Sequence, residues 1–353
     1  MAKLRVGIAG TGGIARAVHI PGFKKLADRV EVVSAFDIDA ERVAAAAKQF
    51  EIPYTFTSFE AMLEGPELDA VAICTPPSSH APLAVQAFQH GLHVLSEKPV
   101  SINAAGAIEM VHAAKQANRI LMVGFQHRFS KPERAIKRLV EDGALGEIYY
   151  ARAQSLRRRG IPGWGVFADK TLSGGGPMMD IGVHVLDQTV YLLGNPRPTT
   201  VFGMTYQKLA TRPGYNNFGP WDPTWFETED FATSQVRFEN GLTLLLEASW
   251  ALNIGQSVHN VLLCGTKGGA ELSPLKFYTE EHGMLLDIEP GEGVLRGPDN
   301  SQDLKIAHFV DCIQNGTTPI VTPSEIINVA LILDAVYESG RTGRPVDIVQ
   351  PPI

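Results

Sequence analysis

The chain begins with a short apolar run that is followed at once by a glycine-rich loop. Leu4–Ala9 is typical of a buried strand, and the loop Gly10-Thr11-Gly12-Gly13-Ile14-Ala15 leads into a helical stretch. In a G-x-G-x-x-G/A pattern, the first glycine permits a tight turn and the second lets the backbone approach a pyrophosphate. The small last residue lets the helix and the sheet pack closely. The feature therefore predicts a strand, a tight turn and a helix in close contact.

This loop is also a candidate dinucleotide site. Backbone N–H groups at the start of a helix can hold phosphates without a basic side chain. The same glycines occur in purely structural turns, but the position between a strand and a helix favours binding. The predicted cofactor contacts of the loop are Gly10, Thr11, Gly12, Gly13 and Ile14.

The first third of the chain alternates apolar runs with helical patterns. Further strands are predicted at 30–36, 70–74, 93–96 and 120–125. Helices are predicted at 14–26, 40–50, 59–63, 82–90 and 104–118, with a break in the first at Pro21-Gly22. Such alternation indicates βαβ units and a parallel sheet that is buried on both faces. We therefore predict an α/β Rossmann domain with a doubly wound parallel sheet over residues 1–124.

After Gly124 the pattern changes to strands without helices between most of them. These runs are 147–155, 199–207, 231–238, 242–250 and 258–264. Asn240-Gly241 predicts a hairpin between two of them. Helices are expected at 177–193 and from the capping box Thr322-Pro323-Ser324-Glu325 to near Gly340. Residues 125–353 are thus predicted to form an α+β domain on a large, mainly antiparallel open sheet, covered by helices on one face.

Asp37 follows the second strand, about twenty residues beyond the glycine loop, where a carboxylate can bind the adenosine ribose hydroxyls. A 2′-phosphate about 4 Å away would meet a repulsion of about 1 to 4 kcal/mol. The position therefore favours NAD over NADP, although Arg42 could offset the repulsion. Alternatively, Asp37 and Asp39 simply cap the next helix.

Two further segments follow strands of the parallel sheet, at the carboxyl edge where ligands bind. They are Thr75-Pro76-Pro77-Ser78-Ser79-His80 and Glu97-Lys98-Pro99. The first could instead be a loop with Ser79 or His80 near a helix N-cap. The additional residues predicted to line the cofactor cleft are Thr75, Pro76, Pro77, His80, Glu97, Lys98 and Gln126.

Lys98 is also a candidate catalytic residue. Pro99 keeps it out of the helical region and restricts its direction. Its ammonium can hydrogen-bond to the oxygen of an alcohol and offset negative charge as the proton leaves. The alternative is a solvated surface lysine.

A second chemical cluster follows Gly174-Gly175-Gly176. Asp180, His184 and Asp187 are spaced four and three residues apart, which places them on one face of a helix. A carboxylate beside an imidazole fixes its tautomer and stabilises its charged form, as general base catalysis requires. The alternative is a buried histidine with satisfied hydrogen bonds and an aspartate favoured by the helix dipole.

Other polar and aromatic residues are candidates for substrate contact. His127 and Arg128 follow a sheet strand, and Trp164 could supply an apolar wall for a ring. Lys98, Asp180 and His184 are expected to touch the same substrate. Arg157-Arg158-Arg159 is either a solvated strand end or an anchor for an anion. Asp180, His184, His80 and His127 are metal-ligand types, but no compact spacing supports a metal site, and none is predicted.

Composition limits the possible partners and location. Lys+Arg 31 against Asp+Glu 38 gives a net charge of −7, so nucleic acid and anionic membranes are unfavourable partners. Cys74, Cys264 and Cys312 include no C-x-x-C pair, which indicates a reducing, cytoplasmic environment without disulfides or a thiolate zinc site. The N-terminus lacks the pattern of a signal peptide, and the most apolar stretches fall short of the ~20 residues of a membrane span.

Together, the glycine loop, Glu97-Lys98-Pro99 and the D-I-G-x-H-x-x-D core of 174–187 resemble the glucose-fructose oxidoreductase / inositol dehydrogenase / rhizopine catabolism (Gfo/Idh/MocA) family. The resemblance covers essentially the whole chain. It implies a Rossmann domain, an open-sheet domain through which homodimers or homotetramers form, and Lys98, Asp180 and His184 as the catalytic set. No subfamily matches the expected substrate regions 125–129, 152–164 and 215–228.

The resemblance also implies a reaction. It is NAD(P)-dependent hydride transfer between a nicotinamide cofactor and a hydroxyl or carbonyl carbon of a sugar, inositol or related polyol. Two alternatives stay open on the same fold. An NAD-assisted glycosidase would oxidise and re-reduce its substrate, and a non-catalytic regulator would bind NAD without transferring hydride.

Overall fold

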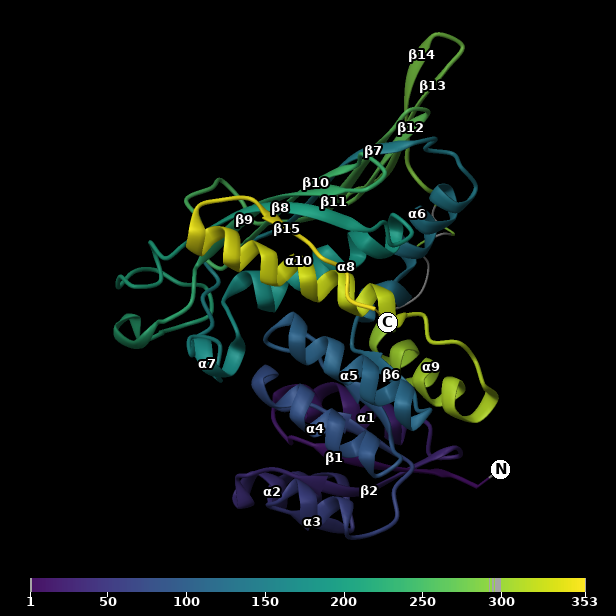
Figure 1. Ribbon diagram of the computed structural model, residues 1–353, viewed down its shortest axis with the longest axis vertical. Helices are drawn as coiled ribbons and strands as arrows, with labels where there is room; N and C mark the ends of the chain where they lie inside the picture. Colours follow the sequence, from purple (N-terminus) through teal and green to yellow (C-terminus); the bar gives the residue numbers. More distant parts are fainter. Residues whose placement is uncertain (1, 292, 294, 296–299, 353) are drawn as a thin grey trace.

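The computed structural model describes residues 2–352 except 292, 294 and 296–299, and these residues form two sheets (Figure 1). The first sheet has six parallel strands in the order β3-β2-β1-β4-β5-β6. They are β1 (Leu4–Ala9), β2 (Val30–Phe36), β3 (Tyr54–Phe56), β4 (Ala70–Ile73), β5 (His93–Ser96) and β6 (Leu121–Val123). The predicted parallel sheet is confirmed, and its order reverses between β1 and β4, which creates a crevice for ligands at the carboxyl ends of the strands.

Helices connect these strands. They are η1 (Ala15–His19), α1 (Ile20–Lys24), α2 (Ala40–Phe50), α3 (Phe59–Leu63), α4 (Pro77–Gln89) and α5 (Ala104–Ala117). The predicted break at Pro21 is wrong, because Pro21 lies in the first turn of α1, after the π-helical turn η1, where its missing N–H is tolerated. Helix α4 begins at Pro77 rather than at residue 82, so neither Ser79 nor His80 is its N-cap.

The second sheet contains nine strands among the described residues, in the order β14-β13-β12-β11-β7-β10-β9-β8-β15. They are β7 (Ile148–Leu156), β8 (Pro198–Tyr206), β9 (Phe231–Phe238), β10 (Thr243–Ser249), β11 (Val258–Gly265), β12 (Gly268–Leu272), β13 (Leu275–Glu281), β14 (Met284–Ile288) and β15 (Val346–Asp347). Strands β7 and β10 pair in parallel, and the other described neighbours are antiparallel. The predicted mainly antiparallel sheet and the hairpin at Asn240-Gly241 are confirmed.

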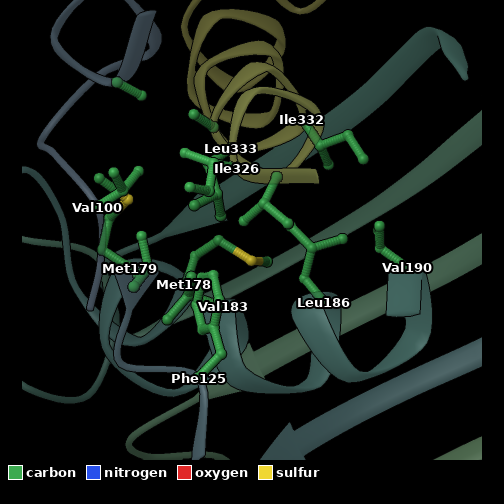
Figure 2. Close-up of a cluster of buried hydrophobic side chains, with 14 of the residues drawn as sticks. Val100, Phe125, Met178, Met179, Val183, Leu186, Val190, Ile326, Ile332 and Leu333 are labelled. Atoms are coloured by element: carbon green, nitrogen blue, oxygen red, sulfur yellow. The ribbon is translucent and has the colours of Figure 1, made fainter. Parts of the chain in front are cut away.

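Helices of the second domain lie between this sheet and the Rossmann domain (Figure 1). They are α6 (Lys131–Glu141), η3 (Met178–Gly182), α8 (Val183–Leu192) and α10 (Pro323–Thr342), with the short elements η2 (Gln126–Phe129), α7 (Lys170–Ser173) and η4 (Pro223–Trp225) beside them. The capping box of α10 is confirmed, and the helix ends two residues beyond the predicted Gly340. Figure 2 shows how Met178, Val183 and Leu186 meet Ile326 and Leu333 of α10 in one buried cluster.

One helix of the C-terminal half joins the core of the first domain. Ile306, Phe309 and Val310 of α9 (Ser301–Asn315) are buried in the same cluster as β1 and the first helix. At Gly22 a Cβ atom would lie 2.3 Å from Ile306 Cδ1, so a larger residue there would displace the end of the Ile306 side chain. The division proposed at residue 124 therefore separates the two sheets but leaves α9 packed on the Rossmann domain.

Among the helices in the described part of the chain, none combines the length and the apolar character that a bilayer span needs.

Candidate active site

The glycine loop follows β1 and faces the crevice at the carboxyl ends of β1 and β4. Gly10 has a φ of +87°, and a Cβ atom there would lie 2.8 Å from the backbone of Cys74, so only glycine fits. At Gly12 and Gly13 a Cβ atom would meet no described atom within 4 Å, and Gly13 and Ile14 are exposed. These two glycines are thus not required by internal packing, and the open space beside them fits a dinucleotide pyrophosphate.

Asp37 connects this loop to the end of β2. Its Oδ2 accepts hydrogen bonds from the N–H and the hydroxyl of Thr11, both at 2.9 Å, and its Oδ1 accepts one from the N–H of Asp39 at 3.1 Å. Asp39, not Asp37, caps α2. Arg42 Nη1 lies 3.4 Å from Asp37 Oδ1, and the Arg42 side chain is half exposed. The buried Asp37 carboxylate therefore stabilises the glycine loop and lies beside a cation at the edge of the crevice.

The loop after β4 is held by His80 from behind. His80 is buried, and its Nδ1 and Nε2 lie 2.8 Å from the carbonyl oxygens of Pro99 and Thr75. His80 was predicted to contact the cofactor. Its ring instead bridges two loops and does not point into the crevice. Thr75, Pro76 and Pro77 remain half-buried or exposed at the sheet edge, as a contact with a ligand requires.

Glu97 is likewise directed inward. Its Oε1 lies 2.8 Å from His19 Nε2 and 3.2 Å from Lys305 Nζ, while its Oε2 accepts a 3.2 Å hydrogen bond from the N–H of Lys98. Burial by itself raises the pKa of Glu97, but the charge of Lys305 and the hydrogen bond from His19 bring that pKa well below its ordinary value. The predicted cofactor contact of Glu97 is replaced by internal ones, and Gln126, at the start of η2, remains partly exposed.

Lys98 connects the two domains. Its Nζ donates hydrogen bonds to Asp180 Oδ1 at 2.9 Å and to the Asp180 carbonyl at 2.8 Å. The peptide bond between Lys98 and Pro99 is cis. Asp180 Oδ2 accepts a further hydrogen bond from Trp250 Nε1 at 3.0 Å. Two predicted catalytic residues from separate domains are thus in direct contact.

His184 lies beside this pair, but the expected hydrogen bond between Asp180 and His184 is absent from the described contacts. The carboxylate is held instead by Lys98 and Trp250, and His184 Nδ1 is buried without a hydrogen-bond partner among the described residues. Burial first, and then the charge of Lys98, lower the pKa of His184 well below its ordinary value. The imidazole is therefore neutral near pH 7, which is the state that a base needs.

Asp180 and His184 open onto a cavity of about 450 Å³. Such a volume suits a small organic ligand. It is lined by Ser155, Leu156, Arg157, Asp180, Ile181, His184, Ser257, Val258 and His259. His259 was not singled out from the sequence. It faces Ser155 across paired strands β7 and β11, with Nδ1 3.3 Å from the Ser155 hydroxyl. Only the register of these two strands brings His259 to the cavity, and a single sequence does not predict that register.

The other predicted substrate residues differ in position. The His127 ring packs edge-on against His184, with centroids 5.2 Å apart, and it also lies 5.7 Å from the His259 ring. His127 is thus part of the imidazole cluster beside the cavity. Trp164 is 55% exposed and packs near Phe218 in a loop outside the cavity lining.

Arg128 and Asp187 form a separate buried group. The guanidinium of Arg128 is fully buried, with Nη2 2.6 Å from Asp187 Oδ1 and Nη1 2.8 Å from Glu325 Oε1. Burial, opposed by Arg128, raises the pKa of Asp187 to about 6. Three residues beyond His184 the helix has risen by almost a turn, so Asp187 reaches η2 rather than the cavity. Arg128 is therefore held within the core and is not part of the cavity lining.

Within the described ranges, no group of three or more His, Cys, Asp or Glu side chains is arranged to hold a metal ion.

Comparison with known proteins defines the family. A model described as oxidoreductase family, NAD-binding Rossmann fold, matches residues 4–125, and one for the GFO/IDH/MocA C-terminal domain matches residues 134–271. The chain belongs to the GFO/IDH/MocA oxidoreductase family. The resemblance inferred from the three motifs is confirmed, and so is the predicted class of NAD(P)-dependent oxidoreductase.

Within the GFO/IDH/MocA family, D-glucoside 3-dehydrogenase of Escherichia coli is 35% identical over 98% of this chain and 97% of its own length. The scyllo-inositol 2-dehydrogenase (NAD(+)) of Bacillus subtilis is 28% identical over 88% of this chain and 85% of its own. Among solved structures, an oxidoreductase domain protein from Kribbella flavida, 25% identical, has a TM-score of 0.85 and covers 99% of this chain and 100% of that one. The fold is thus shared over nearly the full length.

Proposed function

We propose that this protein is an NAD-dependent sugar dehydrogenase that oxidises a secondary hydroxyl of a hexopyranoside, with a glucoside as the first candidate. The observation that carries the proposal is that the Lys98 ammonium of one domain contacts Asp180 of the other, and that Asp180 and His184 line one cavity. The hydroxyl and imidazole groups of the lining suit a ligand with many hydroxyls. The similarity to D-glucoside 3-dehydrogenase of Escherichia coli supports the choice of sugar.

His184 is the base in this proposal. Its lowered pKa keeps the imidazole neutral, so it can accept the proton of the reacting hydroxyl. General base catalysis of this kind contributes about 10²- to 10⁴-fold to the rate. Because Asp180 does not touch the ring in the described contacts, burial and the charge of Lys98, and not a carboxylate partner, set the protonation state of the base.

Lys98 stabilises the oxygen from which the proton leaves. A lysine ammonium has three N–H donors, and two of them are directed at Asp180, which leaves the third for a substrate oxygen. Asp180, itself anchored by Trp250, fixes the direction of the ammonium. The glycine loop, Asp37 and the loop at Thr75–Pro77 would hold NAD, whose nicotinamide supplies the hydride acceptor.

We also propose NAD rather than NADP, because the Asp37 carboxylate at the end of β2 opposes a 2′-phosphate. Arg42 beside it is the group that could reverse this preference. The helices α6, α8 and α10 cover one face of the nine-stranded sheet, and the other face, with Phe202 45% exposed, is the proposed contact of a homodimer or homotetramer. The proposed location is the cytoplasm.

The test is a panel of glucosides, other glycosides and inositols with NAD and, separately, NADP. We expect NADH to accumulate with at least one hexopyranoside, and nuclear magnetic resonance of the product to locate the new carbonyl. Release of the aglycone without NADH would support an NAD-assisted glycosidase instead. NAD binding without either product would support a regulator.

A further inference from the structure

A lysine of the C-terminal half is buried beside Glu97, the residue that precedes Lys98 in the first domain. Lys305 belongs to α9, its side chain is 0% exposed, and its Nζ lies 3.2 Å from Glu97 Oε1. The same Glu97 oxygen lies 2.8 Å from Nε2 of His19, which is also fully buried. Three elements that are distant in sequence thus meet at one carboxylate.

Stability alone gives little reason for this cluster. Removing an ammonium and a carboxylate from water costs several kcal/mol per ion, and a well-packed apolar pair is often as stable as a buried ion pair. Elsewhere α9 does use apolar side chains against the Rossmann core, namely Ile306, Phe309 and Val310. A charge at position 305 therefore indicates a requirement for an ionised carboxylate at Glu97.

The ionised carboxylate acts directly on Lys98. Glu97 Oε2 accepts the backbone N–H of Lys98 at 3.2 Å, and the Lys98 ammonium then contacts Asp180. The position of the Glu97 carboxylate is closely confined, because a Cβ atom on Gly124 would lie 2.9 Å from its Oε1. A displaced Glu97 would therefore displace the backbone from which Lys98 projects.

We propose that Lys305 is a positioning residue that acts through Glu97 to fix the backbone of Lys98 and the place of its ammonium. The proposal rests on the role given to Lys98 in the proposed function. Helix α9 thus contributes to the active site without contacting substrate or cofactor. The second partner of the carboxylate, His19, connects the same network to the helix of the glycine loop.

The first test compares three variants. Lys305→Met removes the charge and keeps the length, Lys305→Arg keeps the charge, and Lys25→Met is the matched control. Lys25, just after α1, pairs with Asp303 of α9, with Nζ 2.6 Å from Oδ2, but it is exposed and has no described contact with Glu97 or Lys98. We expect Lys305→Met to lower kcat by about tenfold to a hundredfold with little change in KM for NAD, as misplacement of a catalytic group does. Lys305→Arg should recover most of kcat, and Lys25→Met should match the wild type.

The pH profile separates positioning from simple destabilisation. Without Lys305, the pKa of the buried Glu97 rises, so its protonation adds a loss of kcat on the acid side. The other titratable groups near this carboxylate are His19, Lys98, Cys74, His80 and His184. The variant Glu97→Gln has no carboxylate and should lose this added ionisation while kcat stays low.

A chemical readout does not depend on the substrate. Acylation of Lys98 by acetic anhydride, followed by peptide mass spectrometry, reports how firmly its ammonium is held. We expect Lys98 to react several times faster in Lys305→Met than in the wild type or in Lys25→Met. An inactive wild type with this labelling difference would overturn the proposed function and leave the positioning role standing.

If Lys305→Met does not fold, the double variant Lys305→Met/Glu97→Gln removes both charges together and keeps the test open. We expect this variant to be folded, with lowered kcat and faster labelling of Lys98, because a neutral amide holds the Lys98 N–H more weakly than a carboxylate does. Folded Lys305→Met or a folded double variant with the kcat, the pH profile and the labelling of the wild type would overturn the proposal.

Discussion

The two sides of the active site are built in different ways. On the Rossmann side, the functional residues lie in short segments that each follow a parallel strand, such as 10–15 after β1 and 97–99 after β5. On the other side, the cavity is lined by η3 and α8 and by the ends of β7 and β11, two strands distant in sequence that meet through their pairing. The first side can therefore be located from local motifs, whereas on the second side a motif locates Asp180 and His184 and the rest of the lining depends on strand register.

The largest expected effect lies where the two sides meet. Lys98→Ala and His184→Ala should each lower kcat by about a hundredfold or more, because they remove the oxygen-stabilising ammonium and the base. Neither residue lies in the glycine loop, so NADH binding, measured by fluorescence titration, should change little. The control is His90→Ala, at an exposed position at the end of α4. Full activity in both variants would remove the basis of the mechanism.

Arg128 tests whether the second domain's buried charges serve stability. Arg128→Met leaves Asp187 and Glu325 without their buried cation, and we expect a loss of about 3 to 5 kcal/mol in the free energy of unfolding. The matched control is Arg152→Met, which removes a partly exposed ion pair with Glu247 and should cost less than about 1 kcal/mol. Urea unfolding measures both. If Arg128→Met instead left stability unchanged and raised KM for the sugar, Arg128 would contact substrate as the sequence suggested.

Arg128 and Asp187 show which contacts could not be predicted from the sequence. The D-I-G-x-H-x-x-D motif located Asp180 and His184 at the site, but helical spacing alone also placed Asp187 there. Arg128, which forms an ion pair with Asp187, comes from η2. The spacing of residues within one helix does not predict such a contact with another element. Likewise, the predicted strand ends placed His80 and Glu97 at the correct edge of the sheet. They did not show whether the side chains turn toward the crevice or into the protein.

The fold itself followed more directly from the sequence, because strand and helix periods are local. The parallel sheet and the hairpin at Asn240-Gly241 were predicted, whereas short β3 and the strands β12–β14 were not. Lys305 and the burial of α9 on the first domain were also missed, since packing between remote segments leaves no local pattern.

The glycine loop allows stability and binding to be separated. At Gly10, alanine would have to adopt a φ of +87°, and its Cβ atom would clash with the backbone of Cys74. Gly10→Ala should therefore lower the free energy of unfolding by more than about 1 kcal/mol. At Gly12 the added methyl group meets no described atom, so Gly12→Ala should keep its thermal unfolding temperature while NAD binds more weakly. Thermal unfolding and NADH titration distinguish the two. Equal NAD affinity in Gly12→Ala and the wild type would place the pyrophosphate elsewhere.

Neighbouring arginines test the side that depends on strand register. Arg157 lines the cavity, while Arg158 donates to the Gly255 carbonyl outside it. We expect Arg157→Ala to raise KM for the sugar by about tenfold, as loss of one hydrogen bond from a charged donor does, and Arg158→Ala to leave KM unchanged. Equal effects in the two variants would mean that the basic run acts as a surface charge and not as part of the cavity.

The smallest effect concerns mild acidification. Protonated His184 cannot accept the hydroxyl proton, but its folded pKa lies well below the ordinary value of about 6.5. As pH falls from 7 toward 6, kcat/KM should therefore stay nearly constant, and the acid limb should appear only at lower pH. In the unfolded chain the same ring has its ordinary pKa and binds a proton first, so stability declines as pH falls through the window between the two values. A limb near 6.5 in kcat/KM would mean that the imidazole is solvated in the free enzyme, and that burial does not set its protonation.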